Sequence, residues 1–191
     1  MIGNWERVLL ARHGQTEWNV VGRRQGQLDS PLTAVGIEQA RRHAGSATGA
    51  DRVFTSPQGR ATATARLIAE ALDLSVVVVD ELAEIHHGGF AGLTDTEIEA
   101  RYPAEWWDRT EDKYEWRFPG GESYADADPR ALRALERIAA DPARRPLIIT
   151  HEMVSRLLLR HLLGLTPQEA LTRRHPHDVL FTIGRDGLTT L

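Results

Sequence analysis

The stretch VLLARHGQTEWN, residues 8–19, joins two kinds of sequence. Its first four residues are apolar and predict a buried strand. Arg12, His13 and Gly14 follow directly, and a polar run then continues to Asn19. Ligands of α/β proteins bind beyond the carboxyl ends of the parallel strands. The stretch therefore predicts an α/β fold with a functional site where its first strand ends.

Outward from this stretch, short apolar runs alternate with segments of helical periodicity. Buried parallel strands are predicted over 7–11, 52–55, 76–79 and 147–150, and an antiparallel hairpin over 179–183 and 188–191. Helices are predicted over 33–43, from Ser56 as N-cap with Pro57 at the first helical position, around 132–139, and over 153–163. This order predicts a three-layer α/β/α sandwich with a mostly parallel central sheet.

The length of 191 residues suits a single domain, predicted over residues 1–191. The segment 94–122 differs from the rest, because it holds three tryptophans among mixed charges and has weak periodicity. We expect it to be a lid insertion rather than part of the core.

The composition argues against several classes of function. The 23 basic and 27 acidic residues give a formal net charge of −4, which disfavours nucleic acid and anionic membranes as partners. The absence of cysteine excludes thiolate catalysis and disulfide scaffolds. No apolar run approaches the length of a membrane span, and the first residues do not follow the pattern of a signal peptide. The expected location is the cytoplasm.

Chemically capable side chains follow each of the four predicted parallel strands. They are Arg12 and His13, then Arg60, then Glu81 or Glu84, and finally His151. Arginine offers planar donors that match phosphate oxygens, and a neutral imidazole is a competent nucleophile toward phosphorus. A nearby carboxyl group can protonate a leaving oxygen and later activate water. The four strand ends therefore predict a site for phosphoryl chemistry.

Six motifs in order resemble the histidine phosphatase superfamily, also called phosphoglycerate-mutase-like. They read RHGQTEWN, GRRQGQLDSPLTAVGIEQA, TSPQGRATATA, ELAEIHHGGFAGL, FPGGES and ITHEMVSRLLL. Together they extend over nearly the whole chain, and their order makes a chance match very improbable.

The resemblance implies a role for each matching residue. His13 corresponds to the nucleophile that becomes phosphohistidine, and Glu84, favoured over Glu81 by its spacing from the glycines, to the general acid and base. The phosphoryl group is then held by Arg12, Arg60 and His151, with Asn19 as a further contact, while Gln25 and Gly26 contact the rest of the substrate. We expect Gly14 to let the backbone approach the phosphate closely. The resemblance implies neither a metal nor a cofactor.

The expected function is a metal-independent phosphatase that hydrolyses a small-molecule phosphomonoester. The alternatives are phosphoryl transfer of the phosphoglycerate mutase type and a non-catalytic phosphate-binding protein. Hydrolysis is favoured because the basic residues of the insertion are interleaved with seven acidic residues between Glu97 and Glu115. The exposed edge of the sheet or the lid leaves room for a homodimer.

Glu152 follows the second histidine, where the family often has glycine. A carboxylate close to phosphate is unfavourable unless it turns away or pairs with a cation. The neighbours His86 and His87 are not expected to form a zinc pair, because adjacent side chains do not usually converge. His175 and His177 flank a proline and are expected to be solvated.

Overall fold

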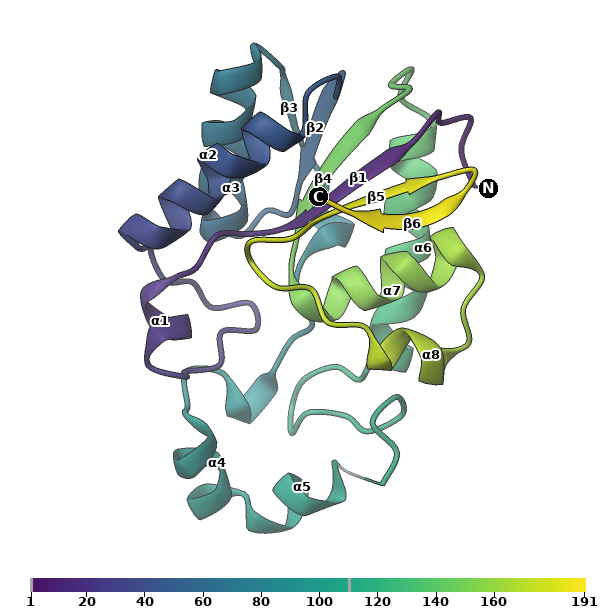
Figure 1. The fold of residues 1–191 in the computed structure, drawn as a ribbon. Coiled ribbons are helices and arrows are strands. Elements are labelled where there is room, and N and C mark those ends of the chain that lie inside the picture. The colour runs from purple at the N-terminus through teal and green to yellow at the C-terminus, as the bar shows by residue number, and fades with distance from the viewer. Residues whose placement is uncertain (1, 110) are drawn as a thin grey trace.

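A six-stranded sheet forms the centre of the computed structural model, which describes residues 2–109 and 111–191 (Figure 1). Its strands are β1 (Val8–Arg12), β2 (Arg52–Thr55), β3 (Val76–Val78), β4 (Pro146–Thr150), β5 (Leu180–Gly184) and β6 (Gly187–Thr190). Their order across the sheet is β3-β2-β4-β1-β5-β6. The first four are mutually parallel, and β5 and β6 run antiparallel at one edge. The predicted mostly parallel sheet is confirmed.

Helices cover both faces of the sheet, as a strand with two apolar faces requires. On one face, α2 (Ala34–Ser46) and α3 (Gly59–Leu72) pack on Leu9, Val53 and Ile149. On the other face, α6 (Tyr124–Ala139) and α7 (Glu152–Leu163) pack on the alternating residues, such as Leu10 and Ile148. The predicted three-layer α/β/α sandwich is therefore confirmed.

The remaining helices are short. They are α1 (Glu17–Val20), α4 (Asp95–Arg101), α5 (Pro103–Asp108) and α8 (Pro167–Thr172), with 3₁₀ turns η1 (Asp80–Leu82) and η2 (Gly88–Phe90). The segment with α4 and α5 lies beyond the carboxyl ends of the parallel strands (Figure 1). It belongs to the predicted lid 94–122, of which residue 110 lies outside the described residues. Within the described ranges, no helix is both long and apolar enough to span a membrane.

Most element boundaries differ from the sequence prediction by one to three residues. Two further errors concern α6, which begins at Tyr124 rather than near residue 132, and Ser56, which is not the N-cap of α3. That helix begins at Gly59, and its N-cap residue Gln58 makes no capping bond with its side chain. The Ser56 hydroxyl instead lies against His151, which directly follows the neighbouring strand β4.

The start of α2 is pressed onto the loop that follows β1. Thr33 caps α2, its N–H donates to the Gln15 carbonyl at 2.9 Å, and its hydroxyl accepts from the Gly36 N–H. A Cβ on Gly36 would overlap the Gln15 carbonyl, and one on Gly14 would overlap the Gly36 carbonyl. Two glycines thus allow the helix and the loop to touch through their backbones.

Gly36→Ala should lower the free energy of unfolding by about 1–3 kcal/mol, because the added methyl group must push α2 away from the loop. Gly45→Ala, in the same helix, is the matched control, since its Cβ would meet nothing within 4 Å. The control should stabilise by about 0.4–1 kcal/mol, as a helical glycine replaced without strain does. Urea denaturation measures both variants, and equal effects would contradict the packing argument.

Candidate active site

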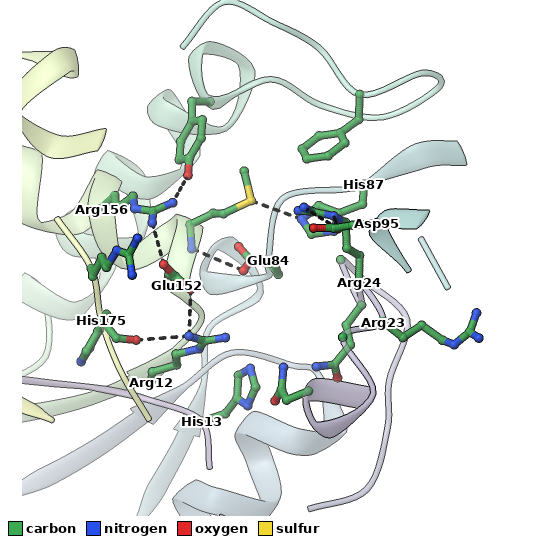
Figure 2. A pocket seen from close by; sticks show the side chains of 18 of the residues that line it. Arg12, His13, Arg23, Arg24, Glu84, His87, Asp95, Glu152, Arg156 and His175 are labelled. Atoms are coloured by element: carbon green, nitrogen blue, oxygen red, sulfur yellow. Dashed lines mark hydrogen bonds and ion pairs between the residues drawn. The ribbon is translucent and has the colours of Figure 1, made fainter. Parts of the chain in front are cut away.

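A pocket of about 670 Å³ opens at the carboxyl ends of the parallel strands, and it gathers most of the predicted site residues (Figure 2). The predicted residues that line it are Arg12, His13, Asn19, Gln25, Gly26, Arg60 and Glu84. Two predicted residues, Gly14 and His151, do not line it. His151 is fully buried and lies one layer deeper.

The ring of His13 is held in one orientation at the end of β1. Its Nδ1 lies 2.8 Å from the Gly14 carbonyl oxygen, which only accepts, so Nδ1 carries the proton. Burial and the charges of Arg60 and Arg12 place the pKa of His13 well below its usual value of 6.5. The ring is therefore neutral near pH 7, and Nε2 carries a free electron pair.

Arg60, in the first turn of α3, occupies the space between the two histidines. Its Nε donates to His13 Nε2 at 3.2 Å, and its Nη2 lies 3.1 Å from His151 Nδ1. The centroids of the two imidazole rings are 5.2 Å apart. Arg60 also forms an ion pair with Asp29, at 3.1 Å. The two predicted histidines and the second predicted arginine are thus in direct contact.

Glu84 is buried at the N-terminus of α7. Its carboxyl oxygens accept from the N–H groups of Ile85, Met153 and Val154, at 3.0, 3.4 and 3.3 Å. Desolvation by burial nevertheless raises the pKa of Glu84, because it outweighs these bonds and the nearby arginines. The rival Glu81 pairs with Arg137 at 3.3 Å and does not line the pocket.

Arg12 does not stand free to meet an anion. Its Nη1 donates to the Glu152 carboxylate at 2.8 Å, and the same carboxylate accepts from Arg156 at 2.6 Å (Figure 2). Glu152 therefore pairs with cations, which is the condition under which a carboxylate is tolerated near phosphate. The sequence alone does not identify Arg156 as a site residue, because it is one of a few polar residues on a mostly apolar helix.

Asn19, Gln25 and Gly26 form one wall of the pocket. Asn19 accepts the Thr16 N–H at 3.0 Å, and Gln25 donates to the Thr16 hydroxyl at 2.9 Å. The Gln25 Oε1 is buried without a hydrogen-bond partner. Gly26 has a φ of +54°, and a Cβ there would overlap His87. A glycine at this position thus lets the wall pack against His87.

Gly14 has a packing role. Its N–H donates to the Thr64 hydroxyl at 3.0 Å, and the room left by its missing side chain is taken by the Gly36 carbonyl. The packing of α2 is thus one reason for glycine here, and the approach of the backbone to phosphate stays a prediction.

The expectation that His175 and His177 are solvated is wrong for His175 and incomplete for His177. His175 is only 1% exposed, and its Nδ1 lies 2.6 Å from the Ser155 hydroxyl. His177 is half-buried, and its Nδ1 donates to the His13 carbonyl at 2.6 Å. His175 and Pro176 of the loop they share line the pocket, which the sequence of the loop alone does not indicate.

Five further cations line the pocket. Arg23 and Arg24 pair with Glu97 and Asp95, and the other three are Arg109, Lys113 and Arg174. Among the described residues, none of the three forms an ion pair, although Arg109 lies over the ring of Trp106 at 4.9 Å. Burial and neighbouring cations lower the pKa of Lys113. The pocket is therefore strongly basic inside an acidic protein.

A metal site is not evident in the part of the chain that the structure describes. Over residues 2–109 and 111–191, no group of three His, Asp or Glu side chains is placed to hold a metal ion. His87 instead stacks on Phe118, with ring centroids 4.5 Å apart, and its Nε2 lies 3.2 Å from the Met153 sulfur.

Glu152→Gln should strengthen the binding of inorganic phosphate about 3- to 10-fold, because the carboxylate competes with an anion for Arg12 and Arg156. Isothermal titration calorimetry at pH 7 measures the affinity. Glu38→Gln changes the net charge equally on the exposed face of α2 and serves as the control. Weaker binding by Glu152→Gln would show that the carboxylate organises the arginines rather than competing for them.

Comparisons with known proteins agree with this geometry. Residues 8–186 match the histidine phosphatase superfamily (branch 1). The chain is 40% identical over 165 residues to the probable phosphoglycerate mutase GpmB of Serratia proteamaculans, covering 83% of this chain and 75% of that protein. It is 34% identical over 161 residues to phosphoserine phosphatase 1 of Hydrogenobacter thermophilus, covering 83% and 76%.

Solved structures give the same result. A putative alpha-ribazole-5'-P phosphatase from Escherichia coli superposes with a TM-score of 0.86 at 26% identity, over 98% of this chain and 95% of that one. A mycobacterial glucosyl-3-phosphoglycerate phosphatase superposes with a TM-score of 0.82 at 27% identity, over 97% and 96%. The chain therefore belongs to the histidine phosphatase superfamily.

Proposed function

We propose that the protein is a metal-independent phosphatase that hydrolyses a small-molecule phosphomonoester through a phosphohistidine at His13. The orientation of His13 carries this proposal. The Gly14 carbonyl holds the ring proton on Nδ1, and the free electron pair of Nε2 is directed at Arg60. A nucleophile is thus held beside the cation that neutralises the phosphoryl oxygens.

The reaction consists of two displacements at phosphorus. In the first, the electron pair of His13 Nε2 forms a bond to phosphorus while the bond to the leaving oxygen breaks, and the Glu84 carboxyl group protonates that oxygen. In the second, water attacks the phosphohistidine and gives a proton to the Glu84 carboxylate, which releases inorganic phosphate and restores both residues. The same carboxyl group serves both steps because its charge changes between them.

The charges required for this chemistry come from the chain itself. Arg12 and Arg60 offer permanent positive charge to the phosphoryl oxygens, so the transition state does not require a metal ion. The desolvation that raises the pKa of Glu84 favours its protonated form, as an acid needs. The same desolvation lowers the pKa of His13 and favours its neutral form, as a nucleophile needs.

Phosphoryl transfer of the mutase type is the second candidate function. The cations Arg109, Lys113 and Arg174, which form no ion pair with the described residues, favour it, because a mutase must hold a second anionic group in the same pocket. The resemblance to the probable phosphoglycerate mutase of Serratia points the same way. An acidic leaving group satisfies the same cations in a hydrolase, so we retain hydrolysis as the main proposal. The segment 94–122 contributes two of these cations and is proposed as the lid.

His13→Ala should lower turnover of a chromogenic phosphate ester about 10⁴-fold or more, because it removes the nucleophile. The wild-type rate should be unchanged by a chelator, and brief exposure to ³²P-labelled ester should label His13 in acid-labile form. Analysis of products from phosphoglycerates separates the two candidates, since a phosphatase accumulates inorganic phosphate and a mutase the isomer. Turnover that survives in His13→Ala would place the nucleophile elsewhere.

Glu84→Gln should lower turnover of alkyl phosphates about 100-fold and of p-nitrophenyl phosphate much less, because only a poor leaving group needs the proton. In the wild type, the alkyl phosphate rate should fall as the pH rises through the raised pKa of Glu84, since the acid is then lost. The variant should lack this alkaline decline. An equal loss for both esters, with the decline retained, would contradict the acid role.

A further inference from the structure

Behind the two histidines, Gln58 and Ser56 form a small polar cluster around His151. The Nε2 of His151 lies 2.7 Å from the Ser56 hydroxyl oxygen and 3.0 Å from the Gln58 Oε1. Ser56 also hydrogen-bonds to that Oε1. The backbone N–H of Glu84 reaches the same oxygen at 3.4 Å. Gln58 thus links the second histidine to the backbone of the proposed acid.

The donors and acceptors of this cluster can be assigned from valence alone. The N–H of Glu84 only donates, so the amide atom it reaches is oxygen and not nitrogen. The single hydroxyl proton of Ser56 is given to that oxygen, because an amide oxygen only accepts. Both oxygens therefore present electron pairs to His151, and its Nε2 must carry a proton.

The opposite ring nitrogen is fixed by the same logic. His151 is buried beside positive charge from three elements, namely Arg12 at the end of β1, Arg60 on α3 and Arg130 on α6, with His13 as the facing ring. Burial and these charges keep its pKa well below 6.5, so the ring is neutral. With the proton on Nε2, the bare Nδ1 accepts from Arg60 Nη2 at 3.1 Å.

The hydrogen bond between Arg60 and His151 leaves neither group free to bind a phosphoryl oxygen together with the other. The Nη2 of Arg60 and the Nδ1 of His151 point at each other, so a phosphoryl oxygen that contacts both must replace their hydrogen bond. The electron pair of Nδ1 would then face a negatively charged oxygen. Only a proton on Nδ1 turns that repulsion into a hydrogen bond.

We propose that Gln58 is a positioning residue that, together with Ser56, keeps one proton on His151 Nε2. When a phosphoryl group binds, a second proton is taken up at Nδ1, and the phosphoryl group then contacts an imidazolium ring. The inference rests on the proposed function of this pocket. The proton for Nδ1 comes from one of two sources. Below its second pKa of about 6, a phosphate monoester itself retains a proton, and above that pH the solvent supplies one. The Gln58 oxygen then stabilises the charged ring through its existing contact.

Two measurements on the wild-type protein test the arrangement without turnover. Long-range ¹H–¹⁵N NMR should show His151 with protonated Nε2 and bare Nδ1 at pH 7, and protonation of both nitrogens with inorganic phosphate. Calorimetric titration with phosphate at pH 8, in buffers of different ionisation enthalpy, should show uptake of about one proton. A His151 that carries its proton on Nδ1, or phosphate binding without proton uptake, overturns the proposal.

Two substitutions of Gln58 test its part. In Gln58→Glu, a carboxylate beside Nε2 should protonate His151 in advance, so the proton uptake falls and the pH dependence of phosphate affinity moves to higher pH. In Gln58→Leu, Nε2 loses one of its two acceptors, so the imidazolium is less stabilised and phosphate affinity at pH 7 should fall about tenfold. A purely structural role would weaken binding in both variants without moving the pH dependence, and that result overturns the proposal.

Gln27→Leu is the matched control. Gln27 donates to the Glu84 carbonyl at 3.1 Å but makes no contact with His151, so proton uptake should be unchanged. The outcome is separable from that of the proposed function. Turnover surviving in His13→Ala refutes the phosphatase mechanism, whereas the tautomer of His151 is observed by NMR in either case.

Discussion

The guanidinium of Arg60 is the constraint around which the site is built. A buried arginine must satisfy five N–H donors, and each donor of Arg60 has an acceptor. Nη1 reaches the Leu28 carbonyl and Asp29, Nη2 reaches the Gly26 carbonyl and His151, and Nε reaches His13. The loop 26–29 and both histidines are therefore oriented by one planar group that lies 2% exposed. A lysine could not replace it, because a single ammonium lacks this flat fork of donors.

The chain surrounds this cation with compensating charge in a way that keeps the pocket basic. Asp29, whose side chain is 40% exposed, forms an ion pair with Arg60, and Glu152 forms ion pairs with Arg12 and Arg156. Each carboxylate offsets the positive charge of the arginines with which it pairs. The chain as a whole has a formal net charge of −4, so the cations that line the pocket form a local excess of positive charge within an acidic protein.

The fold was predictable from the sequence where local chemistry determines it. The apolar runs of the four parallel strands and the position of Arg60 after β2 follow from hydrophobic burial and strand polarity. The contacts between residues that lie far apart in the sequence could not be predicted in this way. Ser56 resembles an N-cap, but its hydroxyl is used by His151; Gly14 suggests phosphate contact, but its space is used by α2. Similarly, His175 sits in a polar loop sequence, and its burial comes from packing on Phe181. Hydrogen bonds between distant segments leave no periodic signal in either one.

Burial shifts the pKa of both proposed reactive groups in the direction that their proposed roles require. Burial disfavours charge of either sign, so it raises the pKa of Glu84 and lowers that of His13. An exposed pair at neutral pH would present a carboxylate, which cannot donate a proton, and a partly protonated imidazole, which is a poorer nucleophile. In the pocket, desolvation shifts both groups toward their neutral forms. A bound phosphoryl group would then bring the negative charge that Arg12 and Arg60 are placed to neutralise.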